Sequence, residues 1–141
     1  MELTTQQIDF LRSLKTLNDS DDIRVKEIIK KKLIENDMII YLLNNKELED
    51  QEADPSDYLG VNILPFYLIH ETLHNVQNFI CYEVETREEH RYNNTIKMLD
   101  IIFYVLCDEK NGIDKTTGIA RHDLLSALII HDFNWTNLFG K

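Results

Sequence analysis

The chain of 141 residues has few cysteines, glycines and prolines, and it contains no long apolar run. Its two cysteines, Cys81 and Cys107, predict reduced core thiols, and a disulfide between neighbouring strands is the alternative. The four glycines form no glycine-rich phosphate loop. No apolar run reaches the ~20 residues that span a bilayer, and the N-terminus is acidic and polar, unlike a secretory signal. We therefore expect no membrane partner.

Positive charge is also scarce, because 25 acidic residues stand against 15 basic ones and give a net charge of −10. This balance disfavours specific nucleic-acid binding, which needs cationic contacts to phosphate. The negative charge fits a protein that binds other proteins, and it also suits a surface that repels nucleic acid while letting it pass. Hydrophobic residues make up 43% of the chain, which argues against a disordered segment.

The pattern of apolar residues predicts a single α+β domain over residues 1–141. We divide it into a helical N-terminal part (1–45), an acidic linker (46–60) and a mixed sheet–helix part (61–141). In the first part, a capping box at Thr4 and Gln7 predicts a short helix to about residue 17. Further helices are expected over 21–35 and 38–43. The expected apolar side of the second helix consists of Ile23, Ile28, Ile29 and Leu33.

The third part is expected to form an antiparallel sheet of three or more strands. The strands are predicted over 61–69, 77–85 and 95–107, and a C-terminal helix over 117–132 packs on the sheet. The last strand is the longest run with strand character, and we expect it to lie at the centre of the sheet. We place a bulge near its residues 99–100 and expect its end to be covered on both faces.

One motif carries chemistry, His70-Glu71-Thr72-Leu73-His74, which matches H-E-x-x-H. On a helix, the two histidines can bind Zn²⁺ while Glu71 activates the bound water. The flanking segments read as strands, however, and no third ligand is marked. We therefore expect no metal, no cofactor and no catalytic residue, and we keep a zinc-dependent hydrolase that uses His70, Glu71 and His74 as an alternative.

Polar and aromatic residues in three places are candidates for contacts between subunits. Arg121 and His122 open the last helix with its polar side outward, and aromatic residues follow in the tail. The charged loop 86–94 precedes the longest strand. The interface candidates are Arg91, Tyr92, Arg121, His122, Trp135 and Phe139.

Segments 57–69, 78–85, 91–110 and 117–140, with the opening 10–33, resemble small structural proteins of tailed phages and prophages of low-GC Gram-positive bacteria. The most specific part is the run GIARHDL (118–124) followed by FNWTNLFG (133–140). The order of elements is similar to that of tail terminators and neck proteins, although those usually carry one more strand and no H-E-x-x-H.

This resemblance implies a non-enzymatic virion protein of the head–tail junction that is assembled in the host cytoplasm. It implies a ring, usually a hexamer, with other neck or tail-tube proteins as partners, and a neighbouring subunit is one way to complete the sheet. A different class remains open, a phage-encoded inhibitor whose acidic surface mimics DNA and binds a basic host protein.

Overall fold

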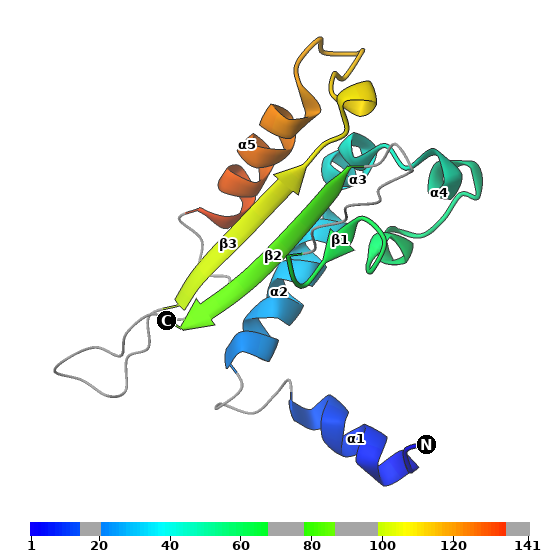
Figure 1. Ribbon diagram of the computed structural model, residues 1–141, viewed down its shortest axis with the longest axis vertical. Helices are drawn as coiled ribbons and strands as arrows, with labels where there is room; N and C mark the ends of the chain where they lie inside the picture. The colour runs from blue at the N-terminus through cyan, green and yellow to red at the C-terminus, as the bar shows by residue number, and fades with distance from the viewer. Residues whose placement is uncertain (15–20, 68–77, 87–98, 135–141) are drawn as a thin grey trace, which may run out of the picture.

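The computed structural model describes residues 1–14, 21–67, 78–86 and 99–134, and within them helices accompany a three-stranded sheet (Figure 1). The helices are α1 (Thr5–Ser13), α2 (Asp21–Glu35), α3 (Asp37–Leu43), α4 (Lys46–Asp50) and α5 (Arg121–Phe133), with 3₁₀ helices η2 (Pro55–Tyr58) and η3 (Glu109–Asn111). The strands are β1 (Ile63–Leu64), β2 (Phe79–Thr86) and β3 (Leu99–Leu106). This arrangement confirms the α+β class. None of the described helices has the length and apolar character needed to cross a membrane.

α1 begins where its cap was predicted. The Gln7 amide donates to Thr4 Oγ1 at 3.3 Å and the Thr4 amide donates to Gln7 Oε1 at 2.9 Å, which completes the capping box of α1. Between α2 and α3, Asn36 leaves the helical conformation, and its Oδ1 accepts the Met38 amide at 3.0 Å. Asn36 therefore ends one helix and caps the next.

The core side of α2 is rotated from the expected one. Val25, Ile29 and Leu33 are fully buried at i, i+4 spacing, whereas Ile23 is 41% exposed and Ile28 is half-buried. These three residues, each about one turn apart, determine which side of α2 faces the sheet. The expected assignment of Ile23 and Ile28 to the core was therefore wrong.

The sheet is mixed, and its order is β1-β2-β3. β1 pairs with β2 in parallel and β2 pairs with β3 antiparallel, so the predicted antiparallel meander was wrong at its first strand. β1 is two residues long, because Pro65 follows it and cannot donate to a ladder. The long strand lies at an edge of the sheet rather than at its centre, and the expected central position is occupied by β2 (Figure 1).

β3 also differs from the prediction in its local geometry. Its register with β2 runs without interruption from Phe79↔Leu106 to Thr86↔Leu99, so the expected bulge near 99–100 is absent. Every residue of β3 is half-buried, and none is fully covered as we expected for its end. Residues 95–98 of the predicted strand lie outside the described part of the chain.

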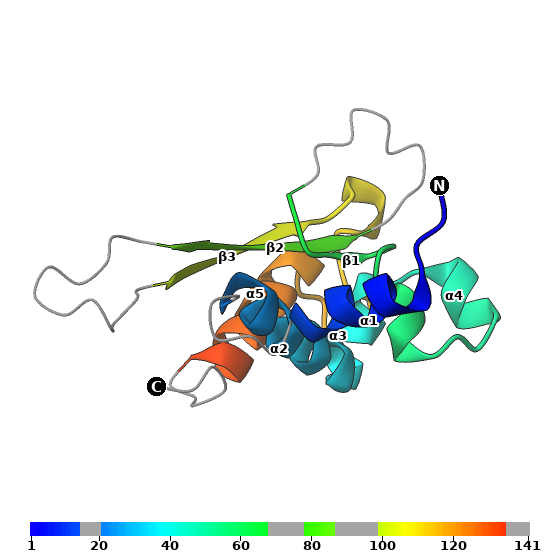
Figure 2. The ribbon, with the colours of Figure 1, turned by 90° about the horizontal axis from the view of Figure 1, so that it is seen from below.

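The described helices α2, α3 and α5 lie on the same side of the sheet (Figure 2). α5 begins at Arg121 rather than at 117, because residues 113–120 form a turn closed by the bridge Ile113↔Ala120. Gly118 lies in this turn at φ 74°, a conformation that suits glycine. The buried core between helices and sheet consists of Val25, Ile29, Leu33, Ile39, Leu42, Leu43, Tyr58, Ile63, Ile80, Tyr82, Val84, Leu125 and Ile129.

The predicted acidic linker contains ordered structure. α4 and η2 both fall within it, and Tyr58 at the end of η2 is 2% exposed and belongs to the core. Asn45 caps α4 by accepting the Leu48 amide on its side-chain oxygen at 3.2 Å. The segment therefore packs on the rest of the described chain through its last turn.

Buried asparagines join the helices to the sheet. Asn45 Nδ2 donates to Asn62 Oδ1 at 2.8 Å, and Asn62 Nδ2 donates to the Asn78 carbonyl at 2.8 Å. Asn78 Nδ2 donates to the Leu42 carbonyl at 3.2 Å, while its Oδ1 accepts the Asp108 amide at 3.2 Å. Because all three asparagines are almost fully buried, each hydrogen bond satisfies a polar group that water cannot reach.

Candidate functional site

Several of the predicted site residues lie outside the described residues. The H-E-x-x-H motif, with His70, Glu71 and His74, falls in the undescribed range 68–77. The interface candidates Arg91, Tyr92, Trp135 and Phe139 also lie outside the described ranges. Their proposed roles stay predictions.

Arg121 does not face outward as we expected. Its side chain is 8% exposed, and Nη1 lies 3.5 Å from the Tyr41 carbonyl and 3.4 Å from the Leu42 carbonyl at the end of α3. Its guanidinium also lies 5.8 Å from the centre of the Tyr41 ring and 3.9 Å from Asp114 Oδ1. Arg121 therefore holds the start of α5 against the end of α3, whereas its neighbour His122 is exposed and remains available to a partner.

Among the carboxylates of the described chain, Asp114 has the largest pKa shift. The Tyr41 hydroxyl donates to its Oδ1 at 2.7 Å, and the Thr117 hydroxyl and amide donate to its Oδ2 at 2.7 and 3.1 Å. These hydrogen bonds, with that from Tyr41 first, lower the pKa of Asp114 from 3.8 to about 2, against the opposing effect of burial. A carboxylate with its lone pairs engaged in this way is a structural acceptor and a poor general base.

Both cysteines are thiols, as expected. Cys81 lies in β2 and is 1% exposed, and Cys107 lies one residue after β3. Burial raises the pKa of the Cys107 thiol to about 11, although the charge of Arg121 acts in the opposite direction. Because the thiolate is the nucleophile, Cys107 is unsuited to nucleophilic catalysis near neutral pH.

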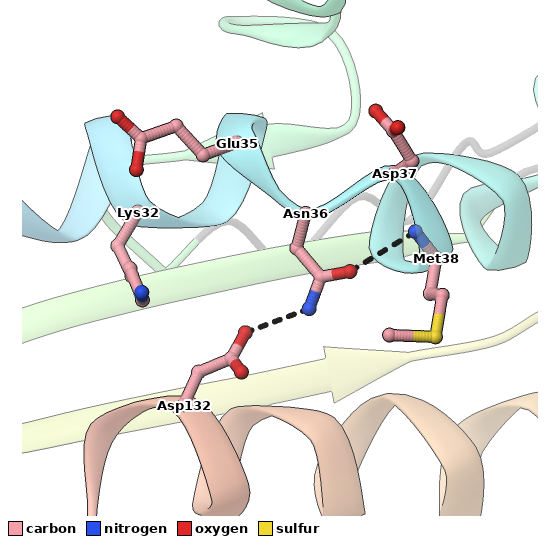
Figure 3. Close-up of a pocket in the computed structure, with 6 residues that line it drawn as sticks. All are labelled: Lys32, Glu35, Asn36, Asp37, Met38 and Asp132. Atoms are coloured by element: carbon pink, nitrogen blue, oxygen red, sulfur yellow. Dashed lines mark hydrogen bonds between the residues drawn. The ribbon is translucent and has the colours of Figure 1, made fainter.

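A cavity of about 420 Å³ lies where α2, α3 and α5 meet (Figure 3). Asn36 Nδ2 donates to Asp132 Oδ2 at 2.7 Å, which ties the α2–α3 junction to α5. The carboxylates of Glu35 and Asp37 point away from Asp132, so the acidic groups do not converge (Figure 3). Among the described residues, no group of three histidine, cysteine or acidic side chains can hold a metal ion.

A second groove of about 560 Å³ runs between α2 and the β1 end of the sheet. Lys26 crosses it, and its Nζ donates to the Pro65 carbonyl at 2.8 Å. The Tyr82 side chain reaches the groove from β2, and burial, with a smaller contribution from Glu27, raises the pKa of its hydroxyl to about 12. The walls are mainly apolar, which suits an apolar side chain better than a charged substrate.

Two exposed surfaces are prominent in the described part of the chain. One is α1, which buries no residue and exposes Phe10 and Leu11 at 63% and 51%, and Leu3 just before the helix is 48% exposed. The other is the acidic corner, which we define as the exposed acidic residues of α4, η2 and the turn between them. These are Glu47, Glu49, Asp50, Glu52, Asp54 and Asp57.

The fold and these surfaces define a small acidic α+β protein whose described part exposes an apolar helix and a carboxylate-rich corner. The chain belongs to the YomW family, whose model matches residues 36–141. The family name derives from Bacillus phages and prophages, which marks the chain as phage-associated. No curated protein and no solved structure matches it.

Proposed function

We propose that the chain is a structural protein of the phage virion that assembles into a ring at the head–tail junction, as a tail terminator or neck protein. The observation that carries this proposal is membership of a phage-associated family over residues 36–141. The resemblance of the GIARHDL and FNWTNLFG runs to tail-completion proteins supports this position within the virion. The proposed role is assembly, without catalysis.

The negative charge of the acidic corner supports a position of this surface beside the DNA channel. Six exposed carboxylates lie within residues 46–57, and the one basic residue of that range, Lys46, forms an ion pair with Glu49 at 3.0 Å. A surface that carries only negative charge repels the phosphate backbone, so DNA passes it without binding. In the proposed ring, this corner lines the channel.

The exposed apolar side of α1 supports contacts with neighbouring proteins. Figure 1 shows α1 standing apart from the sheet and the helices packed on it. A helix that leaves Phe10 and Leu11 more than half exposed gains little from packing within its own chain. In the assembled particle, we expect this side of α1 to be covered by another subunit or by a neck or tail-tube protein.

The proposal is tested by locating the protein in phage particles and by deleting its gene. Mass spectrometry of purified particles should detect the chain, and gold-labelled antibodies should mark the head–tail junction in electron micrographs. Particles from the deletion strain should accumulate as separate heads and tails. Joined, infectious particles that lack the chain would overturn the proposal.

The acidic corner also favours a second candidate, a phage-encoded inhibitor that presents carboxylates in place of DNA phosphates to a basic host protein. This candidate predicts a 1:1 complex with a host protein and absence from purified particles. The particle analysis described above therefore separates the two functions. Neutralising the corner with Glu47→Gln, Glu49→Gln and Asp50→Asn should abolish the inhibitor complex, whereas it should leave head–tail joining intact and slow DNA passage.

A further inference from the structure

The two edges of the sheet differ in how well they are protected against pairing. β1 forms one edge and ends after two residues, and Pro65 follows it directly. β3 forms the other edge and continues for eight residues (Figure 1). Natural proteins protect edge strands by making them short, by placing proline, lysine or inward-pointing charges on them, or by adding a bulge. The β1 edge has two of these features.

The sequence of β3 has almost none of them, although α5 lies alongside the strand on the helix side of the sheet (Figure 1). Its sequence, LDIIFYVL, contains no lysine, arginine or proline, and its one charge, Asp100, lies near one end. The uninterrupted register with β2 leaves the strand without a bulge. In the part of the chain that the structure describes, β3 has a ladder partner on one side only. A long, regular and apolar edge of this kind is a template for another strand.

The side chains of β3 are also incompletely covered. On the face away from the helices, Phe79 and Cys81 of β2 are 6% and 1% exposed, while Tyr104 and Leu106 of β3 in the same cluster are half-buried. Phe103 on the helix side is half-buried too, although it packs on Phe133 with ring centres 5.1 Å apart. A further strand beside β3 would cover both faces of this edge at once.

We propose that the partner of this edge is β3 of a second copy of the chain, paired antiparallel about a two-fold axis through Phe103. Side chains on one face of a strand alternate with period two, so this register sets Ile102 against Tyr104 and Ile101 against Val105. It also sets Asp100 against Leu106, which separates the two carboxylates of the pair. Registers centred near Asp100 would oppose like charges, which destabilises a strand pair.

The partner follows from the strands that the described chain offers. β2 is paired on both sides, and β1 is too short and is followed by proline, so β3 itself is the described strand that fits. An antiparallel pair about a two-fold axis uses the same surface on both copies. This inference rests on the self-association proposed above, but not on the position in the virion. It requires that any ring contain an even number of chains, with neighbouring chains pointing in opposite directions along the ring axis.

The first experiment compares two lysine substitutions by native mass spectrometry and sedimentation velocity of the full chain. Ile102→Lys places a charge on the β3 edge and should raise the dissociation constant of the β3–β3 pair about 100-fold. Val61→Lys is the matched control, because Val61 is 40% exposed beside β1 at the opposite edge. It should leave association unchanged. Equal association of the wild type and Ile102→Lys, with both variants folded by circular dichroism, would overturn the inference.

A mixing experiment tests the register itself. Tyr104→Glu should also weaken self-association, because it places a carboxylate opposite Ile102. A 1:1 mixture of Ile102→Lys and Tyr104→Glu chains should form heterodimers, since the introduced ammonium of one chain then faces the introduced carboxylate of the other, while the native pair Tyr104–Ile102 is retained. Native mass spectrometry distinguishes heterodimers by mass. If both variants are folded and no heterodimer exceeds the homodimers, the register is wrong.

Hydrogen exchange tests the contact without any substitution. The amides of 101–106 that point away from β2 should exchange at least about tenfold faster when the wild-type protein is diluted below its dissociation constant. Exchange that is independent of concentration in an oligomeric sample would show that another surface joins the subunits. The proposed virion function would still stand in that case, because the particle analysis tests it separately.

Discussion

Two consecutive amphipathic helices, α1 and α2, differ in whether their apolar sides are buried. α2 buries Val25, Ile29 and Leu33 completely against the sheet, whereas α1 leaves Phe10 and Leu11 more than half exposed (Figure 1). Both helices have apolar residues at helical spacing, which predicts a helix with an apolar side, although the side predicted for α2 was rotated from the observed one. The spacing does not predict whether that side packs within the same chain, because the covering surface comes from distant residues. We call α1 the arm and the remaining described elements the body.

The comparison also changes how the family match is understood. The match begins at residue 36, so both the arm and α2 precede it. α2 nevertheless supplies three fully buried residues of the core. The structural unit is therefore larger than the matched region, and the arm is the part that is separable from the core.

The largest expected effect comes from a core residue of α2. Ile29→Ala removes a fully buried side chain and should lower the free energy of unfolding by about 2–5 kcal/mol, measured by urea denaturation. Ile130→Ala is the matched control, because this isoleucine of α5 is 63% exposed, and it should change stability by less than about 0.5 kcal/mol. Equal losses from the two variants would contradict the assignment of α2 to the body.

The next effect comes from the buried asparagines. Asn78→Ala should lower the free energy of unfolding by about 2 kcal/mol, because it leaves the Leu42 carbonyl and the Asp108 amide without their partner. Asn134→Ala, at an exposed position after α5, serves as the control and should be nearly neutral. A neutral Asn78→Ala, measured by thermal or urea denaturation, would mean that water replaces the amide.

Acid should lower the stability of the body by protonating Asp114. Its pKa in the folded chain is about 2 and its ordinary value is 3.8, so its carboxylate stabilises the fold above about pH 4. This contribution should disappear as the pH falls from about 4 to about 2. Urea midpoints measured across this range should fall less steeply for Asp114→Asn than for the wild type. Asp50→Asn, at an exposed position of the acidic corner, should retain the wild-type slope.

Truncating an apolar side chain of the arm should hardly change the stability of the protein. Phe10→Ala should change the free energy of unfolding by less than about 0.5 kcal/mol, because the ring is 63% exposed. Phe79→Ala in β2 removes a ring that is 6% exposed and should cost about 3–5 kcal/mol by the same measurement. A large loss from Phe10→Ala would place α1 within the body.

The smallest expected effect is that of metal removal. If the H-E-x-x-H match is a coincidence, elemental analysis should find well under one zinc per chain, and EDTA should leave the melting temperature unchanged. The His74→Ala variant should behave in the same way. Stoichiometric zinc that this variant loses would instead support the hydrolase alternative.

Local signals predict the presence of α1, α2, α3 and α5 but miss α4, whereas long-range pairing accounts for the errors in the sheet. The capping box at Thr4 and Gln7 and the apolar stripe of α5 each lie within a few residues, so short patterns are enough to find them. The parallel pairing of β1 was missed because it joins segments through a connection that no short pattern encodes. The same limit hid the burial of Arg121, whose partners Tyr41 and Leu42 lie about 80 residues earlier. The asparagine contacts to Leu42 and Asp108 were missed for the same reason.

The buried stripe of α2 has a consequence for how the chain is made. Residues 21–64 leave the ribosome before β3 and α5 exist, yet the core that covers Val25 and Ile29 includes residues up to Ile129. The hydrogen bond from Asn36 to Asp132 spans 96 residues, so nearly the whole chain must be synthesised before it can form. The core of the body should therefore be completed late in synthesis, and such long-range contacts slow folding. Until the rest of the core is made, the apolar stripe of α2 stays exposed to solvent, which makes the incomplete chain prone to aggregation.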